Sequence, residues 1–249
     1  MSAYKSLNAK YTRSESGGGE WQYLKKMPQE WNISYGDLKF KVKPMGFKHT
    51  GLFPEQAANW DWFSAIIRKA KAADPEKPIK ILNLFAYTGG ATMAAANAGA
   101  EVVHVDASKG IVAQAKENAK LCGLENARIR YIVDDCKKFV ERELRRGNRY
   151  HGIIMDPPSY GRGPGGEVWK LEDSVDELVS LAAGLVADDA LFFLINSYTT
   201  GLSPSTMNYI LDLKVKATHG GHTEADELGL RVTTTGSVLP CGASARWER

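Results

Sequence analysis

The sequence predicts an α/β fold, in which a mostly parallel β-sheet is covered by helices on both faces. Two observations support this prediction. Between residues 79 and 214, short apolar runs alternate with stretches of helical character, as expected for parallel strands that are joined by helices. The chain has 249 residues, of which 43% are hydrophobic, and this is enough for one domain of this class with a small appendage.

The N-terminal region departs from this pattern. Residues 1–30 are polar and include a glycine cluster, so we expect a loosely held extension around a short helix or strand. Residues 31–43 are predicted to form a β-hairpin, because apolar and basic residues alternate over 38–43 after a turn that contains glycine. We therefore divide the chain into an extension with a β-hairpin, 1–46, and a main domain, 47–249.

The predicted elements of the main domain follow in order. A helix is expected over 57–73, and it should end there because Asp74-Pro75 disfavours helical backbone. Strands are then predicted at 79–85, 101–106, 128–133, 151–156 and 190–196, and helices at 89–98, 108–121, 136–146, 172–186 and 204–214. Two β-like runs within 228–247, around a turn at 235–237, should close the sheet as an antiparallel pair.

Composition excludes several functional classes. No stretch approaches the ~18 apolar residues of a membrane span, and the N-terminus lacks the apolar core of a signal peptide. We therefore expect a cytoplasmic protein without membrane contacts. The three cysteines, which have no C-x-x-C spacing, and the five scattered histidines argue against a disulfide framework and against a metal site.

Basic residues permit an RNA partner without requiring one, since the net charge is +3 and the sequence pI is about 8.6. Three lysines share one face of the predicted hairpin: Lys39, Lys41 and Lys43. They form either a stripe that faces phosphate groups or a solvated strand face that discourages pairing with other strands. We favour the second interpretation.

A cofactor site is predicted where the first strand of the alternation ends. The apolar run from Ile79 breaks into the loop Tyr87-Thr-Gly-Gly90, and the next apolar run ends at Asp106, where a carboxylate can meet a ribose diol. The loop has neither the G-x-G-x-x-G of a dinucleotide site nor the Lys-Ser/Thr ending of a phosphate-binding loop. It therefore suits a nucleoside without phosphate, such as S-adenosylmethionine. The alternative is a glycine turn that binds nothing.

Three motifs in chain order carry a family resemblance. They are 50–56 (Thr-Gly-Leu-Phe-Pro-Glu-Gln), 83–90 (Asn-Leu-Phe-Ala-Tyr-Thr-Gly-Gly) and 156–160 (Asp-Pro-Pro-Ser-Tyr). Over 45–247 the chain resembles class I S-adenosylmethionine-dependent methyltransferases, and with these motifs it is similar to the ribosomal large-subunit RNA methyltransferases of the cytosine-C5 type. The resemblance implies a Rossmann-like, seven-stranded, mostly parallel sheet ordered 3-2-1-4-5-7-6, with the cofactor at the carboxyl ends of the first strands.

The resemblance also implies a set of cofactor-binding residues. The methionine side would be lined by Asn83, Phe85, Thr88, Gly89 and Gly90. Asp106 would bind the ribose diol, and the backbone of Ala107 would lie near the adenine. Contacts with the adenine itself would come from Asp135 or its competitor Asp134, together with the amide of Cys136, while the loop from Phe53 to Gln56 would cover the cofactor. Alternatively, Asp106 and Asp135 only cap the helices that follow them.

The acceptor site is expected at the Asp156-Pro-Pro turn. The two prolines stiffen this turn and leave carbonyls free to accept hydrogen bonds from a substrate. Asp156 would hold or deprotonate the acceptor, or would only position the amine of the cofactor. Tyr160 would stack on a base, and Asn196 or Tyr198 would orient it. The following loop, 161–170, is either a lid that uses Arg162, Trp169 and Lys170 or a solvated loop.

One departure from the family changes the expected reaction. Methylation of cytosine C5 needs a nucleophile, and in the similar family a cysteine after the fifth strand supplies it. Residues 195–204 contain no cysteine, and Cys122, Cys136 and Cys241 are not well placed. We therefore expect an RNA methyltransferase, with ribosomal RNA as substrate, that acts on nitrogen or oxygen. The alternatives are a small-molecule methyltransferase and a cofactor- or RNA-binding module without turnover.

The sequence also bears on partners. The first 30 residues are too few for a separate RNA-binding domain, so RNA would have to be recognised by the hairpin, the lid or a partner protein. A homodimer is compatible with the sequence.

Overall fold

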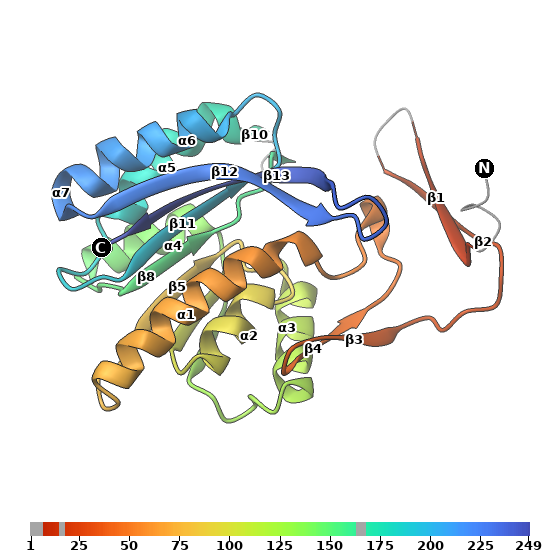
Figure 1. The fold of residues 1–249 in the computed structure, drawn as a ribbon, viewed down its shortest axis with the longest axis horizontal. Helices are drawn as coiled ribbons and strands as arrows, with labels where there is room; N and C mark the ends of the chain where they lie inside the picture. The colour runs from red at the N-terminus through yellow and green to blue at the C-terminus, as the bar shows by residue number, and fades with distance from the viewer. Residues whose placement is uncertain (1–6, 15–17, 163–167) are drawn as a thin grey trace.

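The computed structural model of the protein describes residues 7–14, 18–162 and 168–249. At its centre is a seven-stranded sheet with the order β12-β13-β11-β8-β5-β6-β7 (Figure 1). These strands are β5 (Lys80–Leu84), β6 (Glu101–Asp106), β7 (Ile129–Val133), β8 (Gly152–Met155), β11 (Phe192–Ser197), β12 (His222–Arg231) and β13 (Val238–Glu248). β13 runs antiparallel to β11 and β12, and the other pairs are parallel. Numbered along the chain, the order is 3-2-1-4-5-7-6, so the predicted topology is confirmed.

Helices cover both faces of the sheet, as predicted (Figure 1). One face carries α1 (Ala57–Ala73), α2 (Gly90–Asn97) and α3 (Lys109–Leu121), and the other carries α4 (Cys136–Arg145), α5 (Leu171–Ala183) and α6 (Pro204–Leu211). Each face has its own core because successive strand residues point to opposite sides. Ile81 belongs to the cluster of Phe63 in α1, whereas Leu82 belongs to the cluster of Phe139 in α4.

The predicted element boundaries agree with the observed ones to within three residues through α5 and β11. Two differences lie near the C-terminus. The helix predicted at 204–214 is regular only to Leu211 and continues as a π-helical turn, η4 (Asp212–Lys216), and a short helix, α7 (Ala217–His219). β12 begins at His222 rather than near 228, because its first half is a polar strand at the edge of the sheet, where an apolar run is not needed.

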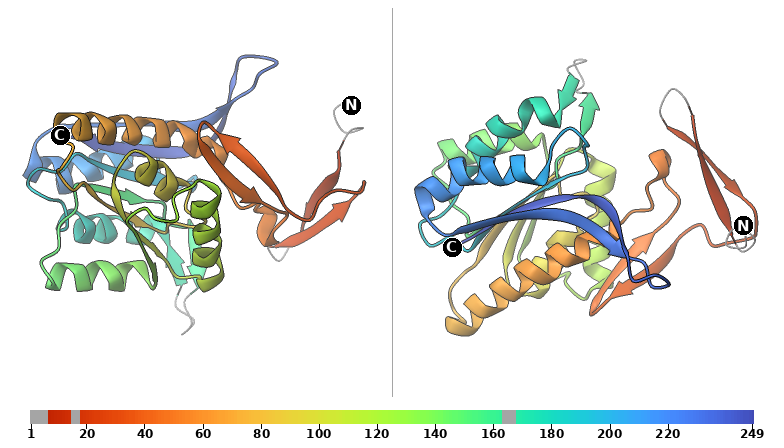
Figure 2. Two further views of the ribbon diagram at one scale, coloured as in Figure 1. Left: turned by 90° about the horizontal axis from the view of Figure 1, so that it is seen from below. Right: turned by 45° about the horizontal axis from the view of Figure 1, so that its top comes forward.

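The N-terminal region contains two hairpins. The predicted one is formed by β3 (Trp31–Tyr35) and β4 (Leu38–Val42), with the turn at Gly36. A second hairpin, β1 (Ala9–Arg13) with β2 (Gly19–Tyr23), replaces the single short element expected over 1–30 and projects from the body of the molecule (Figures 1 and 2). We call it the arm. Trp21 on the arm donates from Nε1 to the carbonyl of Met45 at 2.8 Å, next to the 3₁₀ helix η2 (Gly46–Lys48).

Side chains of α3 pair with the free edge of β4. The Lys41 amide donates to Asn118 Oδ1 at 2.9 Å, and Gln114 Nε2 donates to the Lys41 carbonyl at 3.3 Å. One helical turn further on, Cys122 Sγ accepts from the Lys39 amide and donates to the Lys39 carbonyl. These three α3 residues are spaced by four, so they lie on one face of the helix. The helix therefore takes the place of a third strand beside the hairpin.

The hairpin lysines fit the solvated interpretation in part. Lys41 Nζ lies 3.1 Å from Glu30 and 2.9 Å from Glu117, so its charge is already paired. Lys39 is exposed and Lys43 is half-buried. The opposite face of β4 buries Leu38, Phe40 and Val42 in the domain. The lysine face is therefore not a continuous stripe of unpaired charge.

Candidate functional site

The loop after β5 has an unusual backbone. Phe85, Tyr87 and Gly89 all have positive φ, at 56°, 49° and 87°. For a residue other than glycine, this backbone conformation costs about 1–3 kcal/mol. Hydrogen bonds hold the loop in place: the Phe85 amide donates to Cys136 Sγ at 3.2 Å, and the Tyr87 amide donates to Asp106 Oδ2 at 2.9 Å. The amides of Ala86 and Gly89 also have partners, since they donate to the carbonyls of Val105 and Ala86, each at 3.0 Å.

The glycine at the start of α2 permits close packing. A Cβ on Gly90 would lie 2.6 Å from a ring carbon of Trp60, so no side chain fits between α2 and α1 there. Asn83 is buried below the loop and donates to Thr92 Oγ1 at 2.9 Å. The loop therefore stands on a packed, hydrogen-bonded base.

Asp106 lies at the end of β6 beside this loop. Its carboxylate accepts from the amides of Tyr87 and Ser108, each at 2.9 Å, and burial raises its pKa. The N-cap residue of α3 is Ser108 rather than Asp106, so Asp106 does not act as the helix cap. Asp106 thus joins the end of β6 to the loop after β5. Its carboxylate oxygens retain lone pairs that can accept from a further donor.

Asp135 and Asp134 both have local partners. Asp135 is the N-cap of α4 and accepts from the Lys138 amide at 2.9 Å, as the alternative interpretation expected. Asp134 accepts from the Asp135 amide and pairs with Arg142. The first-turn amides of α4, that of Cys136 included, have no partner within the helix. A contact of any of these groups with adenine remains a prediction.

Half of the predicted site residues line one pocket. Its lining includes Phe53, Gln56, Asn83, Phe85, Thr88, Gly90, Asp156 and Asn196, together with Leu52, Trp60, Phe63, Ala86, Tyr87, Ala91, Ile154 and Leu194. Ala107, Asp134, Asp135 and Cys136 are not part of this lining, and Gly89 and Asp106 flank it through the loop. Tyr160 is 53% exposed. The pocket therefore unites the three sequence motifs.

The segment 50–56 contacts the loop after β5. Thr88 Oγ1 donates to the Gly51 carbonyl at 2.6 Å. The ring of Phe53 packs against those of Tyr87 and Tyr198, with centroids 5.5 and 5.7 Å apart. The segment then turns through η3 (Pro54–Gln56) into α1. It forms one wall of the pocket.

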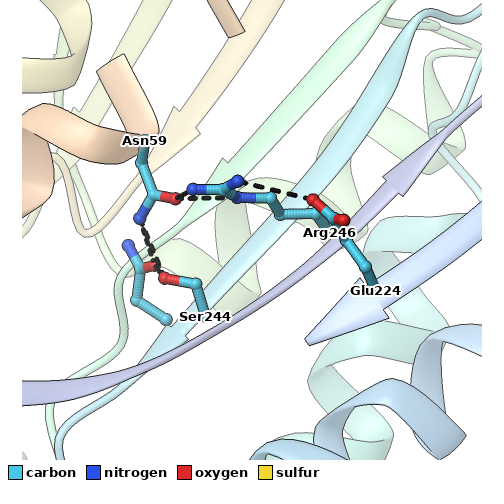
Figure 3. Close-up of polar contacts among 5 residues, drawn as sticks. Asn59, Glu224, Ser244 and Arg246 are labelled. Atoms are coloured by element: carbon cyan, nitrogen blue, oxygen red, sulfur yellow. Dashed lines mark hydrogen bonds and ion pairs between the residues drawn. The ribbon is translucent and has the colours of Figure 1, made fainter. Parts of the chain in front are cut away.

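A polar network joins α1 to β13 next to the pocket (Figure 3). Arg246 on β13 donates from Nε and Nη2 to Asn59 Oδ1, at 3.0 and 2.6 Å, and approaches Glu224 on β12. Asn59 Nδ2 in turn donates to Ser244 Oγ and Asn196 Oδ1. Asn59 is fully buried. The network thus connects α1, β11 and β13 at the carboxyl end of the sheet.

Asp156 lies at the pocket and contacts this network through Asn196. Asn196 donates to its carboxylate, while burial and the nearby charge of Glu55 raise the pKa of Asp156 to about 7. Gln56 Nε2 donates to Tyr198 Oη at 2.7 Å, and burial raises the pKa of Tyr198 well above its ordinary value. Asp156 is therefore a carboxylate that exchanges a proton near neutral pH and is held by the Asn196 amide.

The predicted lid is described only in part, since 163–167 lie outside the described residues. Tyr160–Arg162 (β9) and Val168–Lys170 (β10) pair as two short antiparallel strands. Trp169 Nε1 donates to the Pro158 carbonyl at 2.8 Å, and its ring lies 6.3 Å from that of Phe85. The Pro158 carbonyl is therefore already paired, contrary to expectation, because the side chain of Trp169 folds back over the turn; its second lone pair can still accept.

Comparison with known proteins identifies the family. A family model for S-adenosylmethionine-dependent methyltransferases matches residues 4–207. The chain belongs to this family. A solved methyltransferase dependent on this cofactor, from Agrobacterium tumefaciens, is 36% identical, with a TM-score of 0.89 over 99% of this chain and 78% of that one. A magnesium protoporphyrin IX methyltransferase from Synechocystis, solved with bound cofactor, is 14% identical (TM-score 0.52, 78% of this chain and 80% of that chain) and shares the fold.

Curated relatives of this methyltransferase include ribosomal RNA enzymes. The ribosomal RNA large subunit methyltransferase K/L of Shewanella frigidimarina is 29% identical over 68% of this chain, and that of Legionella pneumophila is 26% identical over 80%. The aligned regions make up 22% and 27% of those proteins. The chain therefore spans about a quarter of the length of these relatives.

S-adenosylmethionine is the cofactor of this family, and the residues of the pocket fit it. The amides of Gly90 and Ala91, which line the pocket at the start of α2 and have no partner within the helix, suit the carboxylate of its methionine part, and Asp106 has acceptor capacity for a ribose diol. The aromatic rings of Phe53, Phe85 and Tyr87 suit its positively charged sulfonium, since ring faces attract cations. Within the described residues, no group of three His, Cys, Asp or Glu could hold a metal ion, and no helix could cross a membrane.

Sequence reasoning missed several residues of this methyltransferase site. Glu55 lies within the 50–56 motif but was given no role, although it is 8% exposed and acts on Asp156. No sequence pattern indicated Asn59, Ser244 or Arg246, because their contacts join residues 185 and 187 positions apart. For Glu55, a signal was present, because it lies inside a motif assigned to the cofactor.

Cysteine positions are consistent with the absence of a thiol nucleophile. Cys136 is buried, and its thiol holds the Phe85 amide; Cys122 pairs with β4. Cys241 on β13 comes close enough to Glu55 for that charge, after burial, to raise its pKa. Because thiolate is the nucleophilic form, all three thiols are poorly suited to attack at neutral pH.

Proposed function

We propose that this methyltransferase acts on RNA, with ribosomal RNA as the substrate, and that it methylates a nitrogen or oxygen atom. The observation that carries the proposal is the half-buried Asp156 carboxylate, held by Asn196 at the cofactor pocket with a pKa of about 7. A base of this strength suits removal of a proton from an amine or hydroxyl near neutral pH. The names of the curated relatives support RNA as the substrate class.

The chemistry needs few groups. When bound, S-adenosylmethionine supplies a methyl group on a sulfonium, and its carbon–sulfur bond breaks as the acceptor lone pair forms the new bond. Asp156 then takes the proton that the acceptor nitrogen or oxygen releases, which leaves a neutral methylated product and a protonated carboxyl. Asn196 orients the carboxylate, and the packed loop walls exclude water.

Charge distribution supports an RNA substrate. Residues 1–48 contain nine Lys and Arg against four Asp and Glu, a net charge of +5, whereas residues 49–249 contain 23 against 25. Exposed cations of this region include Lys10, Arg13, Lys25 and Lys26, in the arm or directly after it. Met45 links the arm to the cofactor loop, since its carbonyl accepts from Trp21 and its Sδ accepts from Tyr87 Oη. We propose that 1–46 holds RNA while 47–249 transfers the methyl group.

Removing the arm cations is expected to weaken RNA binding. In a variant with Ala at Lys10, Arg13, Lys25 and Lys26, we expect at least about tenfold weaker binding to ribosomal RNA in 0.1 M salt. The slope of log affinity against log salt should flatten by about one for each phosphate that the variant no longer neutralises. Fluorescence anisotropy with labelled RNA measures both quantities.

The matched control removes four exposed cations elsewhere: Arg68, Lys69, Arg145 and Arg149. It should bind RNA like the parent protein. Equal loss of affinity in the two variants would show that only total charge matters and would contradict a binding role for the arm.

The function itself is tested by nucleoside mass spectrometry of ribosomal RNA from a strain that lacks the protein. One methylated nucleoside should disappear and return when the gene is restored. An unchanged profile would contradict the RNA proposal; methylation of metabolite extracts would then identify a small-molecule enzyme, and binding without transfer would identify a module without turnover. Because the proposed substrate is ribosomal RNA, we propose a cytoplasmic location.

A further inference from the structure

A row of polar side chains crosses the carboxyl end of the sheet. In the sheet register, Ile195 pairs with Met155, so the residues that follow them, Asn196 and Asp156, lie side by side. Ser244 on β13 pairs directly with Asn196. Asn196 and Ser244 are only 2% and 5% exposed. Because these side chains are buried, their polar atoms need partners within the protein.

Asn59 on α1 joins this row from the neighbouring helix (Figure 3). It is fully buried. Its Nδ2 group donates to Ser244 Oγ and Gln56 Oε1, each at 2.9 Å, and to Asn196 Oδ1 at 3.0 Å. Its Oδ1 atom accepts from Nε and Nη2 of Arg246 at 3.0 and 2.6 Å. One buried amide therefore contacts side chains from η3, β11 and β13.

Arg246 fixes the direction of these hydrogen bonds. A guanidinium has only donors, so the atom of Asn59 that it contacts is the oxygen, and the nitrogen of Asn59 faces the other way. Arg246 is itself held in place, because Nη1 donates to Glu224 at 3.4 Å and Cζ lies 4.9 Å from the centre of the Trp62 ring. Asn59 therefore cannot reverse its amide without leaving two donors of Arg246 unpaired.

The orientation of Asn59 determines that of Asn196. Asn196 Oδ1 accepts from Asn59 Nδ2 and from Ser244 Oγ, the latter at 2.8 Å. The NH₂ group of Asn196 consequently points the other way, where it donates to Gln56 Oε1 at 3.1 Å and to the carboxylate of Asp156. With this amide reversed, its oxygen would face the carboxylate and its nitrogen would face that of Asn59.

We infer that Asn59 is a positioning residue for methyl transfer, which holds an N–H of Asn196 toward Asp156 and thereby orients the carboxylate that receives the proton of the acceptor. Asn59 is not part of the pocket lining, so it acts through Asn196. The task of Asp156 rests on the proposed function, whereas the direction of the amides rests on the hydrogen bonds alone.

Other groups also act on Asp156. Burial and the charge of Glu55 raise the pKa of Asp156, and the donor Asn196 lowers it. Tyr198, which follows β11, is neutral at pH 7 because burial raises its pKa well above the ordinary value. A substitution at Asn59 leaves Glu55 and Tyr198 unchanged, so a change in the pKa of Asp156 reports on Asn196.

The first test replaces Asn59 with Asp in the purified protein. This change keeps the shape of the side chain and the contact with Arg246, but it offers an oxygen where Nδ2 now donates. Asn196 should then turn its NH₂ group toward the new carboxylate and its oxygen toward Asp156. The pKa of Asp156, about 7 in the parent protein, should rise by at least about half a pH unit because the carboxylate loses a donor. NMR titration of isotope-labelled aspartate carboxyls measures this pKa without any acceptor.

Two further variants separate direction from charge. Ala58→Asp places a carboxylate on the exposed neighbour of Asn59 and should leave the pKa of Asp156 unchanged. Asn59→Ala removes the donor without adding charge, so the pKa should again rise; this variant decides the test if Asn59→Asp does not fold. An unchanged pKa in either folded Asn59 variant, or an equal rise in Ala58→Asp, would overturn the inference.

The second test follows methyl transfer from tritiated S-adenosylmethionine to ribosomal RNA of the deletion strain as a function of pH. In the parent protein, kcat should rise with pH through about 7, because Asp156 must be ionised to take a proton. In Asn59→Asp, kcat at neutral pH should fall at least about tenfold and the rise should move to higher pH. The KM for S-adenosylmethionine should stay within about threefold of the parent value, since the cofactor contacts are kept.

A double variant tests whether Asn59 acts through Asp156. In the background of Asp156→Asn, the change Asn59→Asp should lower kcat no further, because the carboxylate that it orients is already gone. An equal fall of kcat in both backgrounds and at every pH would show a merely structural role and would overturn the inference. Absence of transfer by the parent protein would contradict the proposed function, and the NMR titration would still decide the role of Asn59.

Discussion

Replacing Asp156 with Asn is expected to lower kcat/KM for methyl transfer by about 10²–10⁴-fold, the usual contribution of a positioned general base. Asn retains the shape and the hydrogen bond to Asn196 but cannot take a proton. Affinity for S-adenosylhomocysteine, measured by calorimetry, should change only a few-fold, because the lost function concerns the acceptor. The exposed substitution Glu125→Gln provides the activity control.

Two results would argue against this role. Activity of Asp156→Asn within about threefold of the parent protein would show that alignment alone drives transfer. A loss of S-adenosylhomocysteine affinity as large as the loss of kcat/KM would show instead that Asp156 positions the amine of the cofactor.

Replacing Asp106 with Ala is expected to remove most of the rise in melting temperature that S-adenosylhomocysteine produces in the parent protein. Two hydrogen bonds from a ribose diol to a charged acceptor, each contributing about 1.5–3 kcal/mol, correspond to a loss of affinity of more than about 100-fold. The amides of Tyr87 and Ser108 also lose their acceptor, which loosens the loop. Differential scanning fluorimetry with increasing ligand measures the effect.

The control must separate loss of a ligand contact from loss of stability. Ser203→Ala removes the α6 cap, a hydroxyl that accepts from the Thr206 amide, and we expect it to lower the free energy of unfolding by about 1 kcal/mol while most of the ligand shift remains. An unchanged ligand shift in Asp106→Ala would contradict the assignment of the ribose site. A parent protein without any shift would contradict the cofactor assignment.

The centre of the sheet could be predicted because its central strands are buried on both faces. Runs such as Gly152–Met155 are apolar throughout, so they are recognisable without their partners. The arm and the first half of β12 were less visible, since their exposed residues carry little hydrophobic pattern. Local sequence also gave no indication of the π-helical turn at Asp212–Lys216, because tertiary packing sets such irregularities.

The candidate site was predictable to the extent that it is made of contiguous motifs. The three motifs converge on one pocket, as the resemblance implied. What the sequence did not reveal is the support behind them: the Arg246–Asn59 contact joins β13 to α1, and no local pattern encodes such a pairing. Positive φ at Phe85 and Tyr87 was equally hidden, since these residue types do not signal it.

The side-chain ladder between α3 and β4 bears on the order in which the molecule assembles. Its bonds join residues 73 to 83 positions apart, so the hairpin can dock only after α3 has formed and packed, because contacts between distant residues form late. Residues 50–56 follow the hairpin, and the hydrogen bond from Thr88 to the Gly51 carbonyl holds them against the loop after β5. The wall of the pocket is therefore expected to be put in place after the strands it covers, which makes closure of the cofactor site a late event in folding.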